Sequence, residues 1–201
     1  MGGDAKLIGS HADIARKMLK DITNLFDELE IPYVLEFGTL LGIVREGRLL
    51  PWDTDLDISI NDDALDKVIK HKRKIWKLGY RTRVRYFKKD IGSYKVGDIR
   101  ILKIQTRKFF FIKDKGLLDI FVMKREDGGH TFVVGETPSV LKTVPLKYHD
   151  NTSSIDFDGK IYRIPKFYED YLEYIYGDWK TPKKDWDFRY EGNVEIKEVK
   201  E

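Results

Sequence analysis

The chain has 201 residues, of which 41% are hydrophobic and 35% charged, a composition that favours one globular domain and excludes a disordered chain. Its 37 basic and 34 acidic residues leave a net charge of only +3, so the sequence does not indicate a protein that binds nucleic acid. The chain contains no cysteine, which excludes disulfides and any zinc site built on thiolates.

The apolar residues are too dispersed for a membrane span. No stretch approaches the roughly 20 apolar residues that a spanning helix needs, and the first residues lack the apolar core of a signal peptide. We therefore expect a cytoplasmic protein with no integral membrane segment. Basic residues cluster between Lys70 and Lys115 and would give a positive face, suited to phosphate groups or to peripheral contact with anionic lipid. A solvated lysine surface explains them equally well.

The first predicted element is a helix that begins at Ser10, in an S-x-x-D capping pattern, and ends before Pro32 after about five turns. His11 would lie at its exposed beginning. Apolar residues recur at helical spacing and should face the core: Ile14, Met18, Ile22, Leu25, Phe26 and Leu29.

A short strand over 33–37 is predicted next, followed by a turn of small residues. Thr39 stands where it would cap a helix over 40–45, and Gly47 is placed to end that helix. The pattern therefore predicts strand, turn and short helix in quick succession.

A second strand follows, because apolar and polar residues alternate over 55–60. The period of two puts Asp55 and Asp57 on one face and the aliphatic residues on the other. Asn61 is then expected to cap a helix that runs through Leu78. Its inner stripe would consist of Leu65, Val68, Ile69 and Trp76.

The region from 80 to 134 is predicted to be mostly β. Its strands are expected over 80–87, 99–106, 109–112, 117–123 and 131–134. The inner face of the 99–106 strand is not evident from its pattern. The 117–123 run is hydrophobic enough for a central strand, and a single charge, Asp119, interrupts it.

The last quarter changes character. A small hairpin is predicted around Asp158-Gly159, a helix over 167–176, and a flexible charged tail over 186–201. We predict an α+β fold, a mixed β-sheet flanked by helices with a small C-terminal helical extension. The whole of 1–201 would be one domain, with a core over about 10–140 and an extension over about 141–185.

Three carboxylates on predicted strands carry the candidate chemistry. Asp55 and Asp57 share a face, and three like charges converge if the strand of Asp119 lies beside them. Such a cluster is costly when buried unless a cation balances it, and Mg²⁺ or Mn²⁺ is the natural partner of oxygen ligands. Gly38 and Thr39 would offer close backbone approach and amides at a helix start, where phosphate binds well.

A D-x-D pair alone is weak support for a metal site, because surface strands carry such pairs for solubility. The Gly-Thr turn before it and the isolated Asp119 in a later buried run strengthen the interpretation. Together they predict a site for a metal and a phosphate.

Two segments, GTLLGIVR over 38–45 and PWDTDLDI over 51–58, resemble the signature of the LicD family, which includes bacterial phosphocholine transferases and fukutin-type transferases. That family has the nucleotidyltransferase fold, with a Gly-Ser/Thr turn, a D-h-D-h strand and a third strand carboxylate, here Asp119. YGDWKTP over 176–182 is similar to its closing motif, so the resemblance runs from about 20 to 185. Thr54 interrupts the acidic run that the family often has.

The resemblance implies metal-dependent transfer of a substituted phosphate, of the phosphocholine or phosphoribitol kind, from a CDP-linked donor to a hydroxyl of a glycan or glycolipid, such as a cell-surface polysaccharide. Asp55 and Asp57 would hold the metals and Asp119 would complete the site and accept the proton of the attacking hydroxyl. Asp53 would either ligate the metal too or pair with Arg45.

The resemblance also implies a donor-binding set. These residues are Gly38, Thr39 and Arg45 for the phosphates, Trp52 and Trp179 as aromatic walls, and Lys95 and Lys103 as phosphate neighbours. Packing in the core is the alternative for each tryptophan, and a surface position is the alternative for each lysine.

Two other functions stay open at this point. A nucleotidyltransferase of the same fold would move NMP from an NTP to a small molecule or protein and would release pyrophosphate. A non-catalytic relative would bind nucleotides or glycans without chemistry, although three intact carboxylates argue against it.

Overall fold

The computed structural model describes residues 6–108, 112–183 and 186–200, with the backbone alone for 108 and 112–116. The strands are β1 (Val34–Leu35), β2 (Leu56–Asn61), β3 (Tyr80–Tyr86), β4 (Ile99–Lys108), β5 (Ile112–Glu126), β6 (Gly129–Val134), β7 (Ser139–Val144), β8 (Thr152–Phe157), β9 (Lys160–Pro165) and β10 (Glu195–Lys200). The helices are α1 (Ser10–Glu28), α2 (Phe37–Glu46), α3 (Leu65–Lys70), α4 (Lys72–Lys77) and α5 (Tyr168–Tyr176), with 3₁₀ turns η1 (Asp62–Ala64) and η2 (Leu146–Tyr148). This is the predicted α+β architecture.

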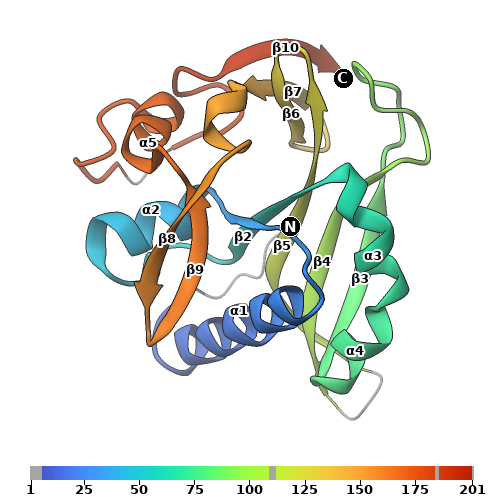
Figure 1. The fold of residues 1–201 in the computed structure, drawn as a ribbon, viewed down its shortest axis with the longest axis vertical. Coiled ribbons are helices and arrows are strands. Elements are labelled where there is room, and N and C mark those ends of the chain that lie inside the picture. Colours follow the sequence, from blue (N-terminus) through green and yellow to red (C-terminus); the bar gives the residue numbers. More distant parts are fainter. Residues whose placement is uncertain (1–5, 109–111, 184–185, 201) are drawn as a thin grey trace.

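Strand β5 is the axis of a mixed sheet. Its middle residues, 118–123, pair in parallel with β2, residues 112–121 pair antiparallel with β4, and its last residues pair with β6. The first part of the sheet is therefore β1-β2-β5-β4-β3, and the second part continues as β5-β6-β7-β10. Figure 1 shows α3 and α4 beside β3 and β4 on the right, and α2 with the β8–β9 hairpin on the left.

The alternation of β2 decides the two faces of the sheet. Leu56 pairs with Leu118 and Ile58 with Ile120, and these four side chains are completely buried in the main core. The residue between them, Asp57, points to the opposite face. The pattern that predicted the strand thus also separates an apolar face from an acidic one.

Helix α1 has the predicted length, but its beginning differs from the prediction. Ser10 is already helical, the capping residue is Gly9, and no side chain of a described residue caps the helix. His11 is buried rather than exposed, whereas Ile14 is 40% exposed. The apolar stripe starts one residue later than expected, because Ala15 and Met18 take the innermost positions.

The helix expected over 61–78 is broken at His71 into α3 and α4. The imidazole Nδ1 of His71 lies 2.8 Å from the carbonyl oxygen of Lys67 and engages the acceptor of the preceding turn. The break rotates the second half, so that Ile75 faces the core. Trp76 is instead 40% exposed, with the Arg107 guanidinium 3.6 Å from its ring centroid.

The structure shows which face of β4 points to the core, a question that the sequence pattern left open. Leu102 and Ile104 belong to the main core, whereas Ile101 and Lys103 face a cavity on the other side of the sheet. The strand predicted over 109–112 lies largely outside the described residues, and Ile112 begins β5.

The tail expected over 186–201 contains a strand. β10 pairs antiparallel with β7, and its alternating lysines and glutamates are those of an exposed edge strand. Strand β7 itself was not predicted. The β8–β9 hairpin and α5 lie where the sequence placed them, with Asp158 and Gly159 both at positive φ in the turn.

Candidate active site

A row of charged side chains crosses three strands on the acidic face of the sheet. Asp57 on β2 lies beside Asp119 on β5, and Asp119 lies beside Lys103 on β4. The Lys103 ammonium contacts Oδ2 of Asp119 directly. The sequence separates these residues widely, and the parallel pairing of β2 with β5 brings the two carboxylates together, as predicted.

The start of α2 is fixed against the middle of this row. The backbone N–H of Glu36 donates to the carbonyl oxygen of Asp57 over 3.0 Å, and the N–H of Asp57 donates to Oγ1 of Thr39 over 2.8 Å. Thr39 is therefore not a helix cap, since α2 begins two residues earlier at Phe37. Its buried hydroxyl instead holds the backbone of Asp57 in register with the helix.

Gly38 is required by the carboxylate of Asp53. A Cβ at this position would lie 2.2 Å from Oδ2 of Asp53, so only glycine lets the acid approach the first turn of α2. The other oxygen of Asp53 accepts the N–H of Thr54 over 2.9 Å. Phe37, just before Gly38, has a positive φ of 45°, a strained conformation of the kind that occurs at functional sites.

Burial and mutual repulsion disfavour the charged forms of the acids. Burial, with the charges of Asp55 and Asp119, raises the pKa of Asp57 well above its usual value. Burial and the charge of Asp119 also raise the pKa of Asp55 to about 6. Burial raises the pKa of Asp119 as well, although Lys103 opposes it. The acidic cluster, Asp53, Asp55, Asp57 and Asp119, is thus short of positive charge.

The donor set of the acidic cluster suits a hard cation, because its members are carboxylates under mutual repulsion. Within the described ranges, however, no three acidic or imidazole side chains stand close enough together to hold a metal ion without movement. The ammonium group of Lys103 forms an ion pair with Asp119, at a position where a metal ion would otherwise balance the carboxylate.

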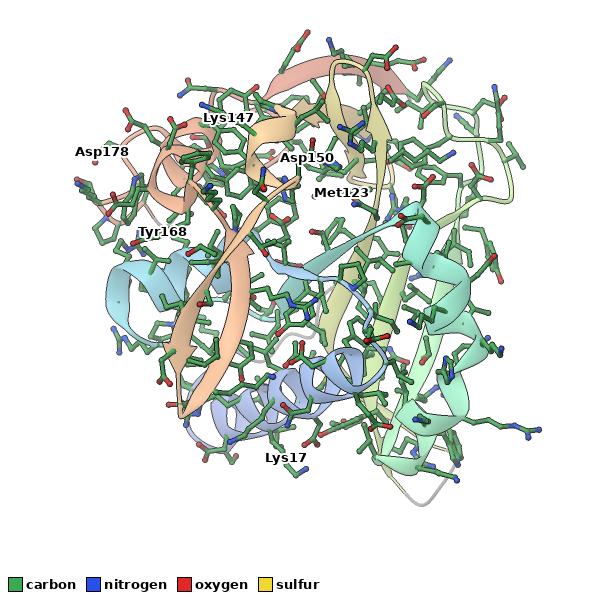
Figure 2. All side chains as sticks on the ribbon, in the orientation of Figure 1. Lys17, Met123, Lys147, Asp150, Tyr168 and Asp178 are labelled. Atoms are coloured by element: carbon green, nitrogen blue, oxygen red, sulfur yellow. The ribbon has the colours of Figure 1, made fainter. Side chains whose placement is uncertain are left out.

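Three members of the acidic cluster, Asp53, Asp57 and Asp119, line a cavity of about 1050 Å³. Aromatic rings also line this cavity, and they come from both halves of the chain: Phe37, Trp52, Phe121, Tyr176, Trp179, Trp186 and Phe188. The ring of Phe37 lies 4.5 Å from that of Phe188 and 5.2 Å from that of Phe121, centroid to centroid. Asp178, labelled beside α5 in Figure 2, also lines the cavity.

Arg45 lies on the wall of this cavity and holds the closing motif in place. Its Nη1 donates to the carbonyl oxygen of Trp179 over 3.0 Å, and its Nη2 pairs with Glu46 at 2.8 Å. The alternative pair with Asp53 is therefore not formed. In the part of the chain that the structure describes, the buried Nε–H of Arg45 has no hydrogen-bond partner, so one donor of the guanidinium remains available for a ligand.

The structure brings most of the predicted site residues together. Those that line the cavity are Gly38, Arg45, Trp52, Asp53, Asp57, Lys103, Asp119 and Trp179. Asp55 does not line the cavity, although the charges of Asp119 and Asp53 raise its pKa, and Thr39 is buried. Lys95 lies elsewhere, where it pairs with Asp90 at 3.1 Å.

Sequence reasoning missed a second buried carboxylate, Glu36. It is completely buried, and its two oxygens accept hydrogen bonds from Ser59 (2.7 Å) and Tyr171 (2.6 Å), with Nε2 of His149 at 2.6 Å. A signal was present, because Glu36 interrupts the apolar run 33–37 as Asp119 interrupts its own strand.

The neighbouring histidine, His130, is held in the same way by an acid. Its Nε2 lies 2.9 Å from Asp150, the residue labelled in Figure 2, and Arg125 forms an ion pair with Asp150 at 2.9 Å. Hydrogen bonding from Arg125 lowers the pKa of Asp150 to about 2. The His130 ring lies 5.4 Å from that of His149, so the two buried imidazoles are neighbours, although Asp150 itself is exposed.

A family model described as the LicD/FKTN/FKRP nucleotidyltransferase domain matches residues 30–167. The chain belongs to the LicD family. The match contains Gly38, the acidic cluster and Lys103. The residues from the closing motif and from 186–189 that line the cavity lie beyond the match.

Two uncharacterized rickettsial proteins are similar to this LicD-family chain. One, from Rickettsia typhi, is 26% identical over 161 residues, which cover 80% of the chain and 40% of that protein. The other, from Rickettsia prowazekii, is 40% identical over 55 residues, 27% of the chain and 21% of that protein. The chain therefore spans less than half the length of these relatives.

A solved structure also resembles the chain. It is the crystal structure of ANT(2")-Ia in complex with adenylyl-2"-tobramycin, with a TM-score of 0.45, 14% identity, and coverage of 89% of this chain and 82% of that one.

Among the described residues, no helix is both long enough and apolar enough to cross a membrane.

Proposed function

We propose that this protein transfers a substituted phosphate, of the phosphocholine or phosphoribitol kind, from a CDP-linked donor to a hydroxyl group of a glycan. The observation that carries the proposal is the register of Asp57 beside Asp119 in the wall of the large cavity, in a chain of the LicD family. Acids set side by side on neighbouring strands are expected where a metal and a phosphate meet.

Asp55, Asp57 and Asp119 would hold Mg²⁺ or Mn²⁺, with Asp53 as a further ligand. Bound there, the metal would neutralise negative charge on the donor phosphates. The raised pKa values of the acids support this assignment, because a cation would relieve the repulsion that contributes to them.

The donor phosphates would lie between the acidic cluster and the wall of α2. The amides at the start of this ten-residue helix provide partial positive charge, and Gly38 leaves room beside them for the Asp53 carboxylate, one of the proposed metal ligands. Arg45 has an unpartnered Nε–H, and Lys103 carries an ammonium at the edge of the cluster. These groups would bind and orient the phosphates before the transfer.

The aromatic part of the cavity would hold the rest of the donor. Trp52 and Trp179 line this part together with Phe37 and Phe188. Flat rings suit the stacking of a cytosine base, and their faces attract a quaternary ammonium such as that of choline. The cavity is large enough for a nucleotide donor, since ligand sites measure about 300–1,000 Å³.

Asp119 would accept the proton of the attacking hydroxyl. Asp119 lines the cavity, so its carboxylate can meet a hydroxyl group that is bound there. Lys103, in contact with the same carboxylate, would fix its orientation and limit how far its pKa rises.

Release of CMP tests the proposal. The protein is incubated with Mg²⁺ and either CDP-choline or CDP-ribitol, with and without a mixture of glycan acceptors, and CMP is quantified by chromatography. Metal-dependent CMP release supports the proposal. Release of pyrophosphate from an NTP instead would identify a nucleotidyltransferase, and calorimetry without metal-enhanced nucleotide binding would identify a non-catalytic relative.

A further inference from the structure

Strand β3 carries a row of arginines on the same face of the sheet as the acidic cluster. Arg81, Arg83 and Arg85 alternate with core-facing residues, and Arg83 pairs in register with Lys103. None of the three forms an ion pair with another residue in the described ranges. The candidate active site is therefore bordered by cations that the fold leaves unpaired.

One end of this row enters a second cavity, of about 350 Å³, which we call the basic subsite. Its charged lining consists of Arg85, Lys88, Lys89, Arg100, Lys200 and one acid, Glu136. Arg100 and Glu136 also line the large cavity, so the two cavities adjoin there. An extended molecule could therefore occupy both.

The two arginines of the basic subsite have little negative charge beside them, whereas Lys200 pairs with Glu198 at 3.1 Å. Arg100 donates to the carbonyl oxygen of Gly135 and lies 3.5 Å from Glu136, its one acidic partner in the described part of the chain. Burial and the nearby charge of Arg85 lower the pKa of Arg100. The Nε–H of Arg85 is buried and has no hydrogen-bond partner among the described residues. A bound anion would satisfy this donor and reduce the repulsion between the two arginines.

We propose that the basic subsite binds a phosphate or carboxylate group of the acceptor, while the acceptor hydroxyl reaches the acidic cluster past Arg100 and Glu136. This inference rests on the proposed function, because it assigns the large cavity to the donor. Guanidinium groups are suited to such a group, since each can donate two parallel hydrogen bonds to it.

The test compares two arginines of one strand. Arg85→Gln removes a charge from the basic subsite, and Arg81→Gln removes the same charge from the same face of β3, outside both cavities. Inorganic phosphate is titrated by calorimetry into the full chain and both variants, in the presence of EDTA. We expect Arg85→Gln to weaken phosphate binding about tenfold or more and Arg81→Gln to change it by less than about twofold. Arg85→Lys, which keeps the charge but not the paired donors, should fall between them.

Equal phosphate affinity in the three proteins would overturn the inference, because phosphate bound in the large cavity does not depend on Arg85. Equal loss in both variants would also overturn it, since that result indicates a diffuse positive surface. Binding to vesicles of phosphatidylglycerol tests whether the bound anion is a lipid headgroup. If both variants reduce vesicle binding equally and inorganic phosphate does not bind, the assignment of the subsite to the acceptor is overturned. CMP release by the wild type is measured separately, so failure of the proposed function is recognised while phosphate binding still reports on the subsite.

Discussion

Two groups of buried carboxylates lie side by side in this protein, and they are treated in opposite ways. Glu36 has hydrogen bonds from Ser59 and Tyr171 and a close imidazole of His149. The acidic cluster has Lys103 as its compensating cation within the described residues, and its members repel one another. The two groups are joined through the backbone, because the N–H of Glu36 donates to the carbonyl of Asp57.

The number of partners that the protein supplies distinguishes a buried acid with a structural role from one that is suited to bind a ligand. A carboxylate whose partners are supplied by the protein holds elements together, and Glu36 ties β2, α5 and the segment after η2 to the start of α2. A buried carboxylate with too few partners is stabilised when a cation binds to it. The acidic cluster is therefore the better candidate for ligand binding, although Glu36 is the more buried.

The largest effect should follow from Asp57→Asn, which removes a charge from the acidic cluster. We expect CMP release to fall about a thousandfold or more, because charge stabilisation by a metal contributes several kcal/mol. The free energy of unfolding should stay the same or rise, since like charges no longer repel. Steady-state rates and urea denaturation of the same preparations measure both. Full turnover in this variant would contradict the assignment of the site.

The reverse result is expected for Glu36→Ala. It leaves the hydroxyls of Ser59 and Tyr171 without their acceptor in a buried layer, so the free energy of unfolding should fall by about 3–5 kcal/mol. Glu28→Ala is the matched control, because Glu28 is exposed and pairs with Lys74; it should cost less than about 0.5 kcal/mol. Similar losses in both variants would remove the distinction between the two groups of acids.

The sequence contained enough to predict the acidic cluster and not enough to predict Glu36. Local patterns are enough to identify both residues: Asp57 belongs to an alternation with a period of two, and Asp119 is a charge within an apolar run. Glu36 shows the second pattern too, but its partners His149 and Tyr171 lie 113 and 135 residues further along the chain. Whether a buried acid is satisfied depends on such distant pairing, which no local pattern reveals.

The same limit explains the aromatic part of the cavity. Charged residues dominate the end of the chain, so 186–201 was predicted to be a flexible tail. Phe188 nevertheless packs on Phe37, and β10 joins the sheet through backbone hydrogen bonds with β7. Composition indicates how much apolar surface a segment can bury, and a few aromatic residues with one strand pairing are enough to fix it.

Lys142 is a buried cation with a neutral hydrogen-bond partner, so it lies between the satisfied Glu36 and the poorly compensated acidic cluster. Its effect on stability can be tested by varying the pH. Its side chain is 1% exposed, and its Nζ donates over 2.5 Å to a neutral partner, the carbonyl of Phe188. Burial lowers the pKa of Lys142 to about 8, below the value of about 10.4 in the unfolded chain. Between these values the unfolded state binds more protons, so the free energy of unfolding should rise with pH, by about 2–3 kcal/mol.

Lys142→Met isolates this contribution. The difference in the free energy of unfolding between the wild type and the variant should change across pH 8 to 10.5 and be constant from pH 6 to 7, because other titrating groups are common to both proteins. Urea denaturation at half-unit pH intervals measures it. A difference that does not vary with pH would show that the buried ammonium is compensated as well as Glu36 is.

The smallest expected effect compares the two groups of acids through a ligand. Mg²⁺ at about ten times its dissociation constant should stabilise the wild type by about 1.4 kcal/mol, because a ligand that binds only the folded state adds to its stability. EDTA should remove this gain. Asp57→Asn should show little of it, since the variant lacks one of the proposed ligands. Glu36→Gln, which changes an acid already satisfied by the protein, should keep the gain although its starting stability is lower. Loss of the Mg²⁺ effect in Glu36→Gln and its survival in Asp57→Asn would exchange the roles of the two acids, because the cation would then depend on the carboxylate that the fold already satisfies.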